Sequence, residues 1–249
     1  MRKLLPFIVI VILIAAWHFA VLWWHSMIIP GPWAVVTGIA ELARKGLLVK
    51  YVVASLYRVT WGYLSAVILA IPFGLFLGWF RRGERAFNPL IQLLRPISPL
   101  AWIPISILWF GVGDLAAIFL IFLASFLPLA VTAMNAVNGI DTVHLNVGRN
   151  FGLSRTRLIR SVIYPAVMPQ LIVGLRITLG IAWLVVVAAE MIAVNSGLGF
   201  LIIDARNAGN RYDLVIAGMV LIGTIGLLLD TVMRRLEQLK TLRWGYENK

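Results

Sequence analysis

Few side chains in this sequence have the types and spacing that catalysis needs. Cysteine is absent, so no disulfide, thiol nucleophile or cysteine metal site can form. The histidines, His18, His25 and His144, lie in different segments without the short spacing of metal ligands. No G-x-x-x-x-G-K-[ST] loop occurs, so the chain has no recognisable means of holding the phosphates of ATP. The sequence therefore predicts no catalytic residue, no metal and no cofactor bound by this chain.

Two ionisable residues, Arg176 and Glu190, stand in one long apolar segment. Charges at mid-membrane cost about 2.5 to 3.5 kcal/mol on insertion scales, so a partner or water usually satisfies them. In a helix they lie on nearly one face but about 21 Å apart, too far to pair. In one interpretation, Arg176 is a positively charged site that binds an anion along the translocation path, and Glu190 and Met191 lie at an outer gate. In the other, Arg176 reaches the inner interface and Glu190 is a buried structural partner.

The composition indicates that lipid surrounds these charges. Hydrophobic residues make up 61% of the 249 positions and charged residues 13%, whereas a soluble domain carries about 25% charged residues. The net charge of +12 does not predict nucleic-acid binding, because the basic residues form short clusters between apolar runs and not one water-facing module. The sequence therefore predicts an all-α polytopic membrane protein.

A helix needs about 20 apolar residues to cross a bilayer. Six segments meet or approach that length: Leu4 to Trp24, Ala54 to Phe80, Pro96 to Val112, Leu115 to Met134, Pro169 to Ala193 and Leu214 to Met233. We divide the chain into a first, uncleaved span (1–25), a periplasmic turn and interfacial helix (26–53), a core of five spans (54–233) and a cytoplasmic tail (234–249). The core includes a cytoplasmic loop at 135–168.

The orientation follows from the Lys and Arg residues, which resist translocation. With the N-terminus inside, fifteen of them fall on the inner side and five on the outer side. An even number of crossings then places both termini in the cytoplasm.

Prolines and glycines mark two unusual spans. Pro96, Pro99 and Pro104 interrupt the third span, and broken helices persist only beside protein or a watery cavity. We place this segment, Pro104 included, near a translocation path; the alternative is a kinked packing helix. In the second span Gly74 and Gly78 stand four residues apart, a spacing that lets helices approach closely.

The loop at 135–168 is too polar to cross a membrane and too short to fold alone. Its middle reads NVGRNFGLSRTRLIRSVIYPAVMP, with Arg155, Arg157 and Arg160 flanking apolar residues at helical spacing. A docking element for a partner protein is one interpretation. The other is a basic amphipathic helix that rests on anionic lipid.

This stretch resembles the cytoplasmic coupling loop of binding-protein-dependent ABC importer permeases, whose pattern is Glu-Ala-Ala, three residues, Gly, nine residues, Ile, one residue, Leu-Pro. Gly152 matches the motif glycine. The resemblance then assigns coupling to the ATPase to Asn146, Val147, Gly148, Gly152, Val162, Tyr164 and Pro165. Asn146 stands where the motif has glutamate, and Tyr164 where it has leucine.

Further stretches resemble the permeases for nitrate, sulfonates, taurine, cyanate or bicarbonate. They are IIPGPWAVV, LIQLLRPISPLAWIPISILWFGVGD, GLRITLGIAWLVVVAAEMIAVNSGLGFLIIDAR and AGMVLIGTIGLLLD. The resemblance implies a type I importer permease fold in the bacterial inner membrane. It also implies a homodimer, two cytoplasmic ATP-binding subunits that use ATP and Mg, and a periplasmic or lipid-anchored binding protein, with membrane lipid around the spans.

The expected function is therefore transport of a small oxyanion, with a sulfonate such as taurine as first choice and nitrate or bicarbonate next. A neutral heterocycle stays open as substrate. The rival from another class is an ion-coupled secondary transporter or channel without ATPases, although such carriers commonly place several ionisable residues at mid-membrane. A membrane-embedded enzyme is the second rival, and it would need a clustered catalytic set.

Overall fold

The structure is a computed structural model that describes residues 5–24, 29–207 and 209–237. Every regular element in these ranges is helical. The helices are α1 (Leu5–Trp24), α2 (Pro32–Arg44), α3 (Leu47–Trp79), α4 (Arg81–Leu94), α5 (Ile103–Phe110), α6 (Asp114–Asn138), α7 (Thr142–Asn150), α8 (Arg155–Leu158), α9 (Tyr164–Ile192), α10 (Leu198–Asn207) and α11 (Tyr212–Glu237). A 3₁₀ turn, η1 (Pro99–Trp102), precedes α5, and a π-helical turn, η2 (Ile159–Ile163), precedes α9. Residues 1–4, 25 and 238–249 of the predicted first span and tail lie outside the described residues.

Four continuous helices within the described ranges are long and apolar enough to cross a membrane: α3, α6, α11 and the helical run from Thr156 to Ile192 that contains α9. The bent pair of α4 and the η1–α5 segment makes a fifth if it counts as one span. In addition, α1 is an apolar helix of 20 residues. The six segments expected from the sequence thus divide into four continuous helices, one bent pair and α1. Among the continuous helices, the largest shifts are at two starts: α3 begins at Leu47, before Ala54, and the α9 run begins at Thr156, before Pro169.

The third span was predicted as a broken helix over Pro96 to Val112, and the structure has η1 followed by α5 in this range. The preceding helix, α4, starts at Arg81 and meets this segment at 83°. Prolines cause the break because each lacks a backbone N–H and restricts the residue before it. Ser98 caps η1 by accepting a hydrogen bond from the Leu100 N–H. Pro104 is exposed in the first turn of α5, where helices tolerate proline.

The centre of the bundle is the packing of α3 against α6, and glycines set its closeness. A Cβ added to Gly74 would lie 2.2 Å from the carbonyl oxygen of Ala130, and one on Gly78 would lie 2.7 Å from that of Met134. Side chains at these positions would push the helices apart. The small-residue pair noted in the sequence is therefore a helix–helix contact.

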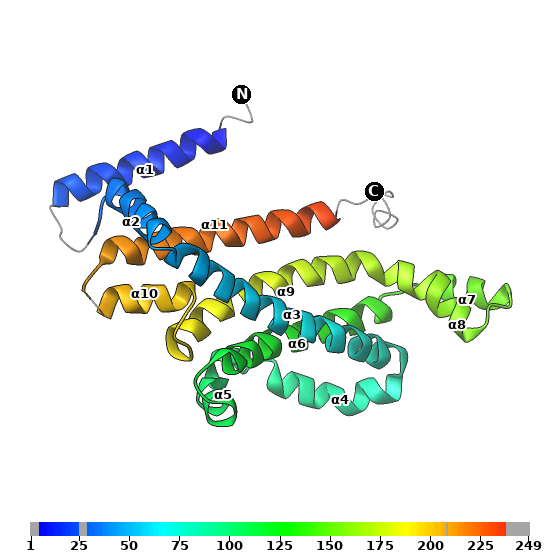
Figure 1. Cartoon of the computed structure of the whole chain (residues 1–249). Helices are drawn as coiled ribbons and strands as arrows, with labels where there is room; N and C mark the ends of the chain where they lie inside the picture. Colours follow the sequence, from blue (N-terminus) through cyan, green and yellow to red (C-terminus); the bar gives the residue numbers. More distant parts are fainter. Residues whose placement is uncertain (1–4, 25–28, 208, 238–249) are drawn as a thin grey trace.

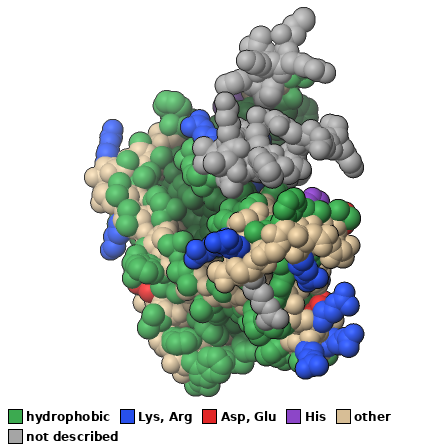
Figure 2. All heavy atoms as spheres, turned by 90° about the vertical axis from the view of Figure 1, so that its right-hand side faces the viewer, with side chains coloured by type: hydrophobic (Ala, Val, Ile, Leu, Met, Phe, Trp, Pro, Cys, Tyr) green, Lys and Arg blue, Asp and Glu red, His purple; other side chains and the backbone are tan. Residues whose placement is uncertain are grey.

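The two ends of the bundle differ in character. Figure 1 shows α7 and α8 together at one end, whereas α2 and α10 lie at the other. The N-terminal end of α1 and the C-terminal end of α11 point toward the end that carries α7 and α8. Figure 2 views that end directly and shows basic side chains lying among hydrophobic ones. We call it the basic end.

Candidate functional site

The segment Thr142–Ile163 forms a helical hairpin, which we call the α7–α8 hairpin. Asp141 begins it as an N-cap, because its carboxylate accepts a hydrogen bond from the Val143 N–H at 2.9 Å. Gly152 ends α7 in the left-handed region at φ +68°, where other L-residues are strained. The Leu153 N–H then donates to the Gly148 carbonyl at 3.2 Å, which satisfies one of the last carbonyls of α7.

Gly148 brings the two arms of the hairpin together. A Cβ at this position would lie 2.5 Å from Cδ1 of Leu158, whose side chain is almost fully buried. The resemblance named Gly148 as a coupling residue, and the structure shows that it packs against the other arm of the hairpin. The hairpin then enters α9 through η2, so that Thr156 to Ile192 form one helical run. A displacement of the hairpin is therefore carried directly into a membrane-spanning helix.

Several apolar side chains are exposed on the hairpin. Phe151 is 81% exposed and Val147 is 47% exposed, and exposed Asn146 lies on the same helix, α7. Tyr164 and Pro165 are exposed where α9 begins, and Val162 is half-buried. An exposed apolar patch away from the spans is typical of a protein interaction surface.

A buried ion pair lies toward the far end of α9 from the hairpin. Arg58 on α3 donates to Oε1 of Glu190 on α9 at 2.7 Å, and the exposed fractions of the two side chains are 2% and 0%. The other carboxylate oxygen accepts from the Ser55 hydroxyl at 2.8 Å and from the Gly199 N–H at 3.0 Å. Glu190 is therefore fully paired within the protein.

Arg58 joins further segments to this pair. Its Nε donates to Oδ1 of Asp114, the first residue of α6, at 2.8 Å. Its Nη1 also donates to the carbonyl oxygen of Ser196 at 2.7 Å. One guanidinium thus holds α3, α6, α9 and the loop before α10 in register.

Two glycines, Gly197 in the loop before α10 and Gly199 in the first turn of α10, let the chain fold over Glu190. Gly197 has φ +108°, and a Cβ there would lie 2.3 Å from the Glu190 carboxylate carbon. A Cβ on Gly199 would lie 2.2 Å from the Val187 carbonyl oxygen. The chain therefore requires glycine at both positions, because a side chain would displace it from the carboxylate.

Arg176 makes a separate set of contacts with α11. Its Nε donates to Asp230 at 2.7 Å and its Nη1 to Glu237 at 3.2 Å. Arg234 also reaches Asp230 at 3.2 Å. Arg176 and Glu190 do not meet, as predicted, because each has partners of its own.

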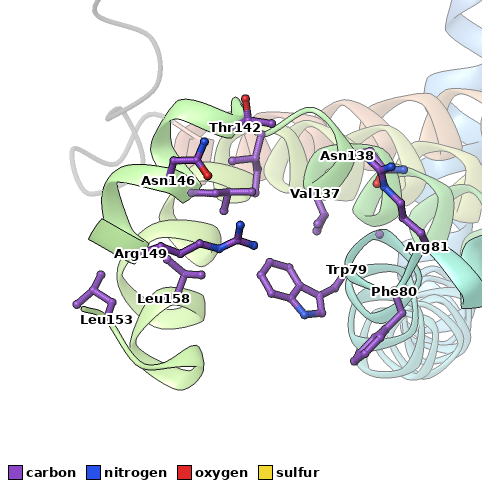
Figure 3. Close-up of a pocket in the computed structure, with 13 residues that line it drawn as sticks. Trp79, Phe80, Arg81, Val137, Asn138, Thr142, Asn146, Arg149, Leu153 and Leu158 are labelled. Carbon is purple, nitrogen blue, oxygen red and sulfur yellow. The ribbon is translucent and has the colours of Figure 1, made fainter. Parts of the chain in front are cut away.

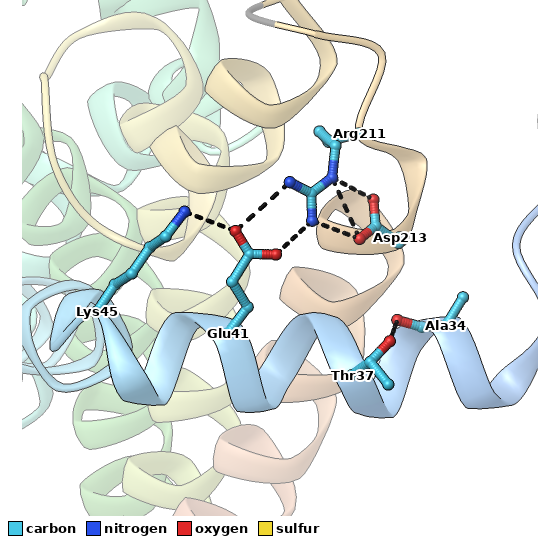
Figure 4. A network of polar contacts seen from close by, with 6 residues as sticks. All are labelled: Ala34, Thr37, Glu41, Lys45, Arg211 and Asp213. Carbon is cyan, nitrogen blue, oxygen red and sulfur yellow. Dashed lines mark hydrogen bonds and ion pairs between the residues drawn. The ribbon is translucent and has the colours of Figure 1, made fainter.

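A third network ties α2 to the start of α11, and Figure 4 shows it. Arg211 donates to Glu41 at 2.6 Å and to Asp213 at 2.8 Å, while Lys45 reaches Glu41 at 2.6 Å. The Arg211 hydrogen bond, helped by Lys45, lowers the pKa of Glu41 from 4.5 to about 2. The Asp213 and Glu41 carboxylates raise the pKa of Arg211 in turn. Glu41 and Arg211 therefore stay charged at neutral pH.

Comparison with known proteins agrees with this architecture. Residues 70–241 match the family described as binding-protein-dependent transport system inner membrane component. The chain belongs to that family. It is an importer permease subunit and a multi-pass protein of the bacterial inner membrane.

Two relatives and one solved structure place the permease more closely. It is 34% identical to the taurine transport system permease protein of Escherichia coli over 231 residues, 87% of this chain and 83% of that protein. It is 38% identical to a nitrate import permease protein of Leptolyngbya laminosa over 182 residues, 73% of this chain and 65% of that one. A chain from a structure of inward-facing conformations of the MetNI methionine ABC transporter superposes with a TM-score of 0.68 at 20% identity, covering 77% of this chain and 95% of that chain. The last likeness shows the shared fold.

The structure brings the predicted residues of this permease into two groups. The residues proposed for coupling gather on the hairpin and at the start of α9. Glu190 and Met191 lie near the end of α9, where Met191 is 37% exposed, and Arg176 lies between the two groups on the same helix. Pro104 is on α5, within the bent third span.

Sequence reasoning missed Arg58, Asp114 and Phe151. Arg58 lies inside the second apolar segment, Ala54 to Phe80, and a cation buried in a span requires a carboxylate partner. Asp114 ended a quoted apolar stretch, and an acidic residue at that place starts α6. Phe151 directly precedes the motif glycine, so its position was the available signal.

Proposed function

We propose that this permease moves a small oxyanion across the inner membrane in an ATP-driven importer, with a sulfonate such as taurine as first choice and nitrate or bicarbonate next. It works as a homodimer with two cytoplasmic ATP-binding subunits, which use ATP and Mg, and with a periplasmic or lipid-anchored binding protein. Both termini are cytoplasmic. The 34% identity to a taurine permease and the 38% identity to a nitrate permease support this substrate class.

The observation that carries the proposal is the α7–α8 hairpin. It is closed at both ends of α7, tightly packed at Gly148 and continuous with α9, so it can move as a rigid body. Exposed Phe151 and Val147 supply an apolar surface for a partner. ATP binding draws the ATPases together, and the hairpin carries that movement to the spans, which alternate between two packings.

The charges in the spans favour this mechanism over an ion-coupled carrier. Arg58 and Glu190 are paired with each other, and Arg176 is paired with Asp230. A proton- or sodium-coupled route requires carboxylates that can exchange an ion. Here these carboxylates are held by arginines.

Reconstitution tests the proposal. Proteoliposomes would hold the permease, the ATPase and the binding protein encoded beside it, and uptake of radiolabelled taurine, nitrate and bicarbonate would be measured. We expect uptake of one of these that requires ATP and the binding protein. Uptake by the permease alone, driven by a proton or sodium gradient, would replace the proposal with the rival.

A pair of glycine variants tests the role of the hairpin. Gly152 and Gly46 both adopt a left-handed φ, at +68° and +69°, and neither has an atom within 4 Å of an added Cβ. Tryptophan therefore strains both sites equally, but only Gly152 lies on the hairpin. Gly152→Trp should uncouple ATP hydrolysis from uptake, whereas Gly46→Trp should leave the ratio of the two unchanged. If ATP hydrolysis and uptake stayed coupled in Gly152→Trp, the proposed role of the hairpin would be contradicted.

A further inference from the structure

A cavity of about 710 Å³ separates the α7–α8 hairpin from the end of α3. Figure 3 shows Arg149 reaching from α7 across the hollow toward Trp79, with Phe80 and Arg81 on the opposite side. Asn138 and Asn146 add amide groups to the lining. The cavity therefore has an arginine on each side, and polar and apolar side chains both line the space between them.

An apolar groove of about 240 Å³ continues from this cavity. The two hollows share Trp79, Phe80 and Val137 in their linings. Beyond these residues the groove runs over aliphatic and aromatic side chains from α3, η2 and the start of α9, including Phe76 and Ile163. The combined site thus has a basic mouth and an apolar channel.

The arginines of the basic mouth are available to bind an anion. Arg81 and Arg149 are exposed, and neither forms an ion pair within the described ranges. The nearby carboxylate of Glu84 accepts a hydrogen bond from Asn138 at 3.0 Å, and Arg85 joins these residues in an adjoining hollow. Guanidinium groups are suited to phosphate oxygens because their N–H donors match them in pairs.

We propose that this site binds one anionic phospholipid, with its phosphate between Arg81 and Arg149 and an acyl chain in the groove. A phosphate ion or an acidic side chain of a partner would satisfy the arginines but leave the apolar groove exposed to water. A phospholipid offers a partner to both parts, and the groove lies at the end of α3 and the start of α9, two helices that are long and apolar enough to cross a membrane. This proposal rests on the proposed function in one respect: the proposed topology puts the bound lipid in the cytoplasmic leaflet.

The lipid would connect the end of α3 to the hairpin, the element proposed to couple with the ATPase. The alternative noted in the sequence, a basic helix on anionic lipid, is thus narrowed to one site. General attraction to an anionic surface involves every basic residue of the loop, whereas this site requires Arg81 and Arg149.

Quenching of Trp79 by brominated phosphatidylglycerol tests the site. The full chain would be placed in phosphatidylcholine nanodiscs with increasing fractions of the brominated lipid, and the Trp79 signal would be taken as the difference between the natural chain and Trp79→Phe. We expect saturable quenching. The double variant Arg81→Gln/Arg149→Gln should weaken it by about 25-fold, since each basic residue near a membrane contributes about fivefold.

The matched control is Arg157→Gln/Arg160→Gln, which removes two exposed arginines of the same end that do not line either hollow. It should change the quenching less than twofold. Arg81→Lys/Arg149→Lys keeps the charge and should retain most of the binding, which separates loss of the site from loss of the fold.

Four outcomes would overturn the proposal. Equal weakening in both glutamine pairs would mean general surface attraction, and equal quenching by brominated phosphatidylcholine would mean that no headgroup is selected. Displacement by millimolar inorganic phosphate would indicate a site for the free anion. Unchanged quenching in Arg81→Gln/Arg149→Gln, together with loss of the copurifying ATPase, would assign the arginines to the partner protein.

Discussion

Replacing Arg58 with methionine leaves the Glu190 carboxylate buried without its cation. Removing one member of a buried ion pair costs about 3 to 5 kcal/mol, because the remaining charge is uncompensated. At about 2 to 4 °C per kcal/mol for a domain of this size, the unfolding midpoint should fall by about 6 to 20 °C. Glu190→Gln should cost less, about 1.5 to 3 kcal/mol, because Arg58 keeps its bonds to Asp114 and Ser196.

The double variant Arg58→Met/Glu190→Gln carries the decisive comparison. The neutral amide that replaces the Glu190 carboxylate no longer needs a cation, so the double variant should be more stable than the sum of the two single losses by at least about 1.5 kcal/mol. The midpoint would be measured as the loss of monodisperse protein on size-exclusion chromatography after heating. Arg44→Met, at an exposed arginine without an ion pair in the described part of the chain, should change stability by less than about 0.5 kcal/mol. Strictly additive losses would refute the pairing argument.

Three other perturbations test separate parts of the structure. Gly148→Ala should raise the number of ATP molecules hydrolysed per substrate imported, because overpacking against Leu158 costs about 1 to 3 kcal/mol and opens the hairpin. The control is Gly83→Ala, whose added Cβ has its nearest atom at 3.5 Å, and it should leave that ratio unchanged. Arg176→Gln should reduce transport and Asp230→Asn in the same chain should restore it, whereas a double variant as inactive as the single one would favour the interpretation in which Arg176 binds an anion. Because the pKa of Glu41 is lowered from 4.5 to about 2, the stabilisation by its carboxylate should be complete above pH 4.5 and be lost as the pH falls toward 2. The measurement is the difference in unfolding midpoint between the natural chain and Glu41→Gln from pH 8 to 2. A change in that difference between pH 8 and 5 would contradict this prediction.

The sequence predicts the helical fold well because long apolar runs leave the backbone no alternative in lipid. Helix α2 (Pro32–Arg44) lies within the segment 26–53 where a helix was expected, and its interfacial position stays a prediction. Gly74 and Gly78 lie at the α3–α6 contact. The motif spacing around Gly152 also located a turn that the structure closes with a left-handed glycine.

Partners across distant parts of the chain could not be predicted in the same way. Arg58 and Glu190 are 132 positions apart, and only the packing of α3 on α9 brings them within 2.7 Å. Arg176 was expected to face an anion or the inner interface, but Asp230 and Glu237 come to it from α11. The bend of 83° in the third span depends on how α4 and α5 pack, which the prolines permit but do not set.

The hairpin's contact with an ATPase is the central claim, and single-cysteine crosslinking tests it directly. The natural chain has no cysteine, so Asn146→Cys on the hairpin and Arg206→Cys on α10 each give one reactive thiol without background. In membranes that contain the assembled importer, a short reagent with a maleimide at one end and a photoreactive group at the other should join Asn146→Cys to the ATP-binding subunit, at a yield that changes with ATP. Arg206→Cys should give no such product. Labelling of Asn146→Cys from outside intact cells, or no crosslink to the ATPase from the hairpin, would contradict the account.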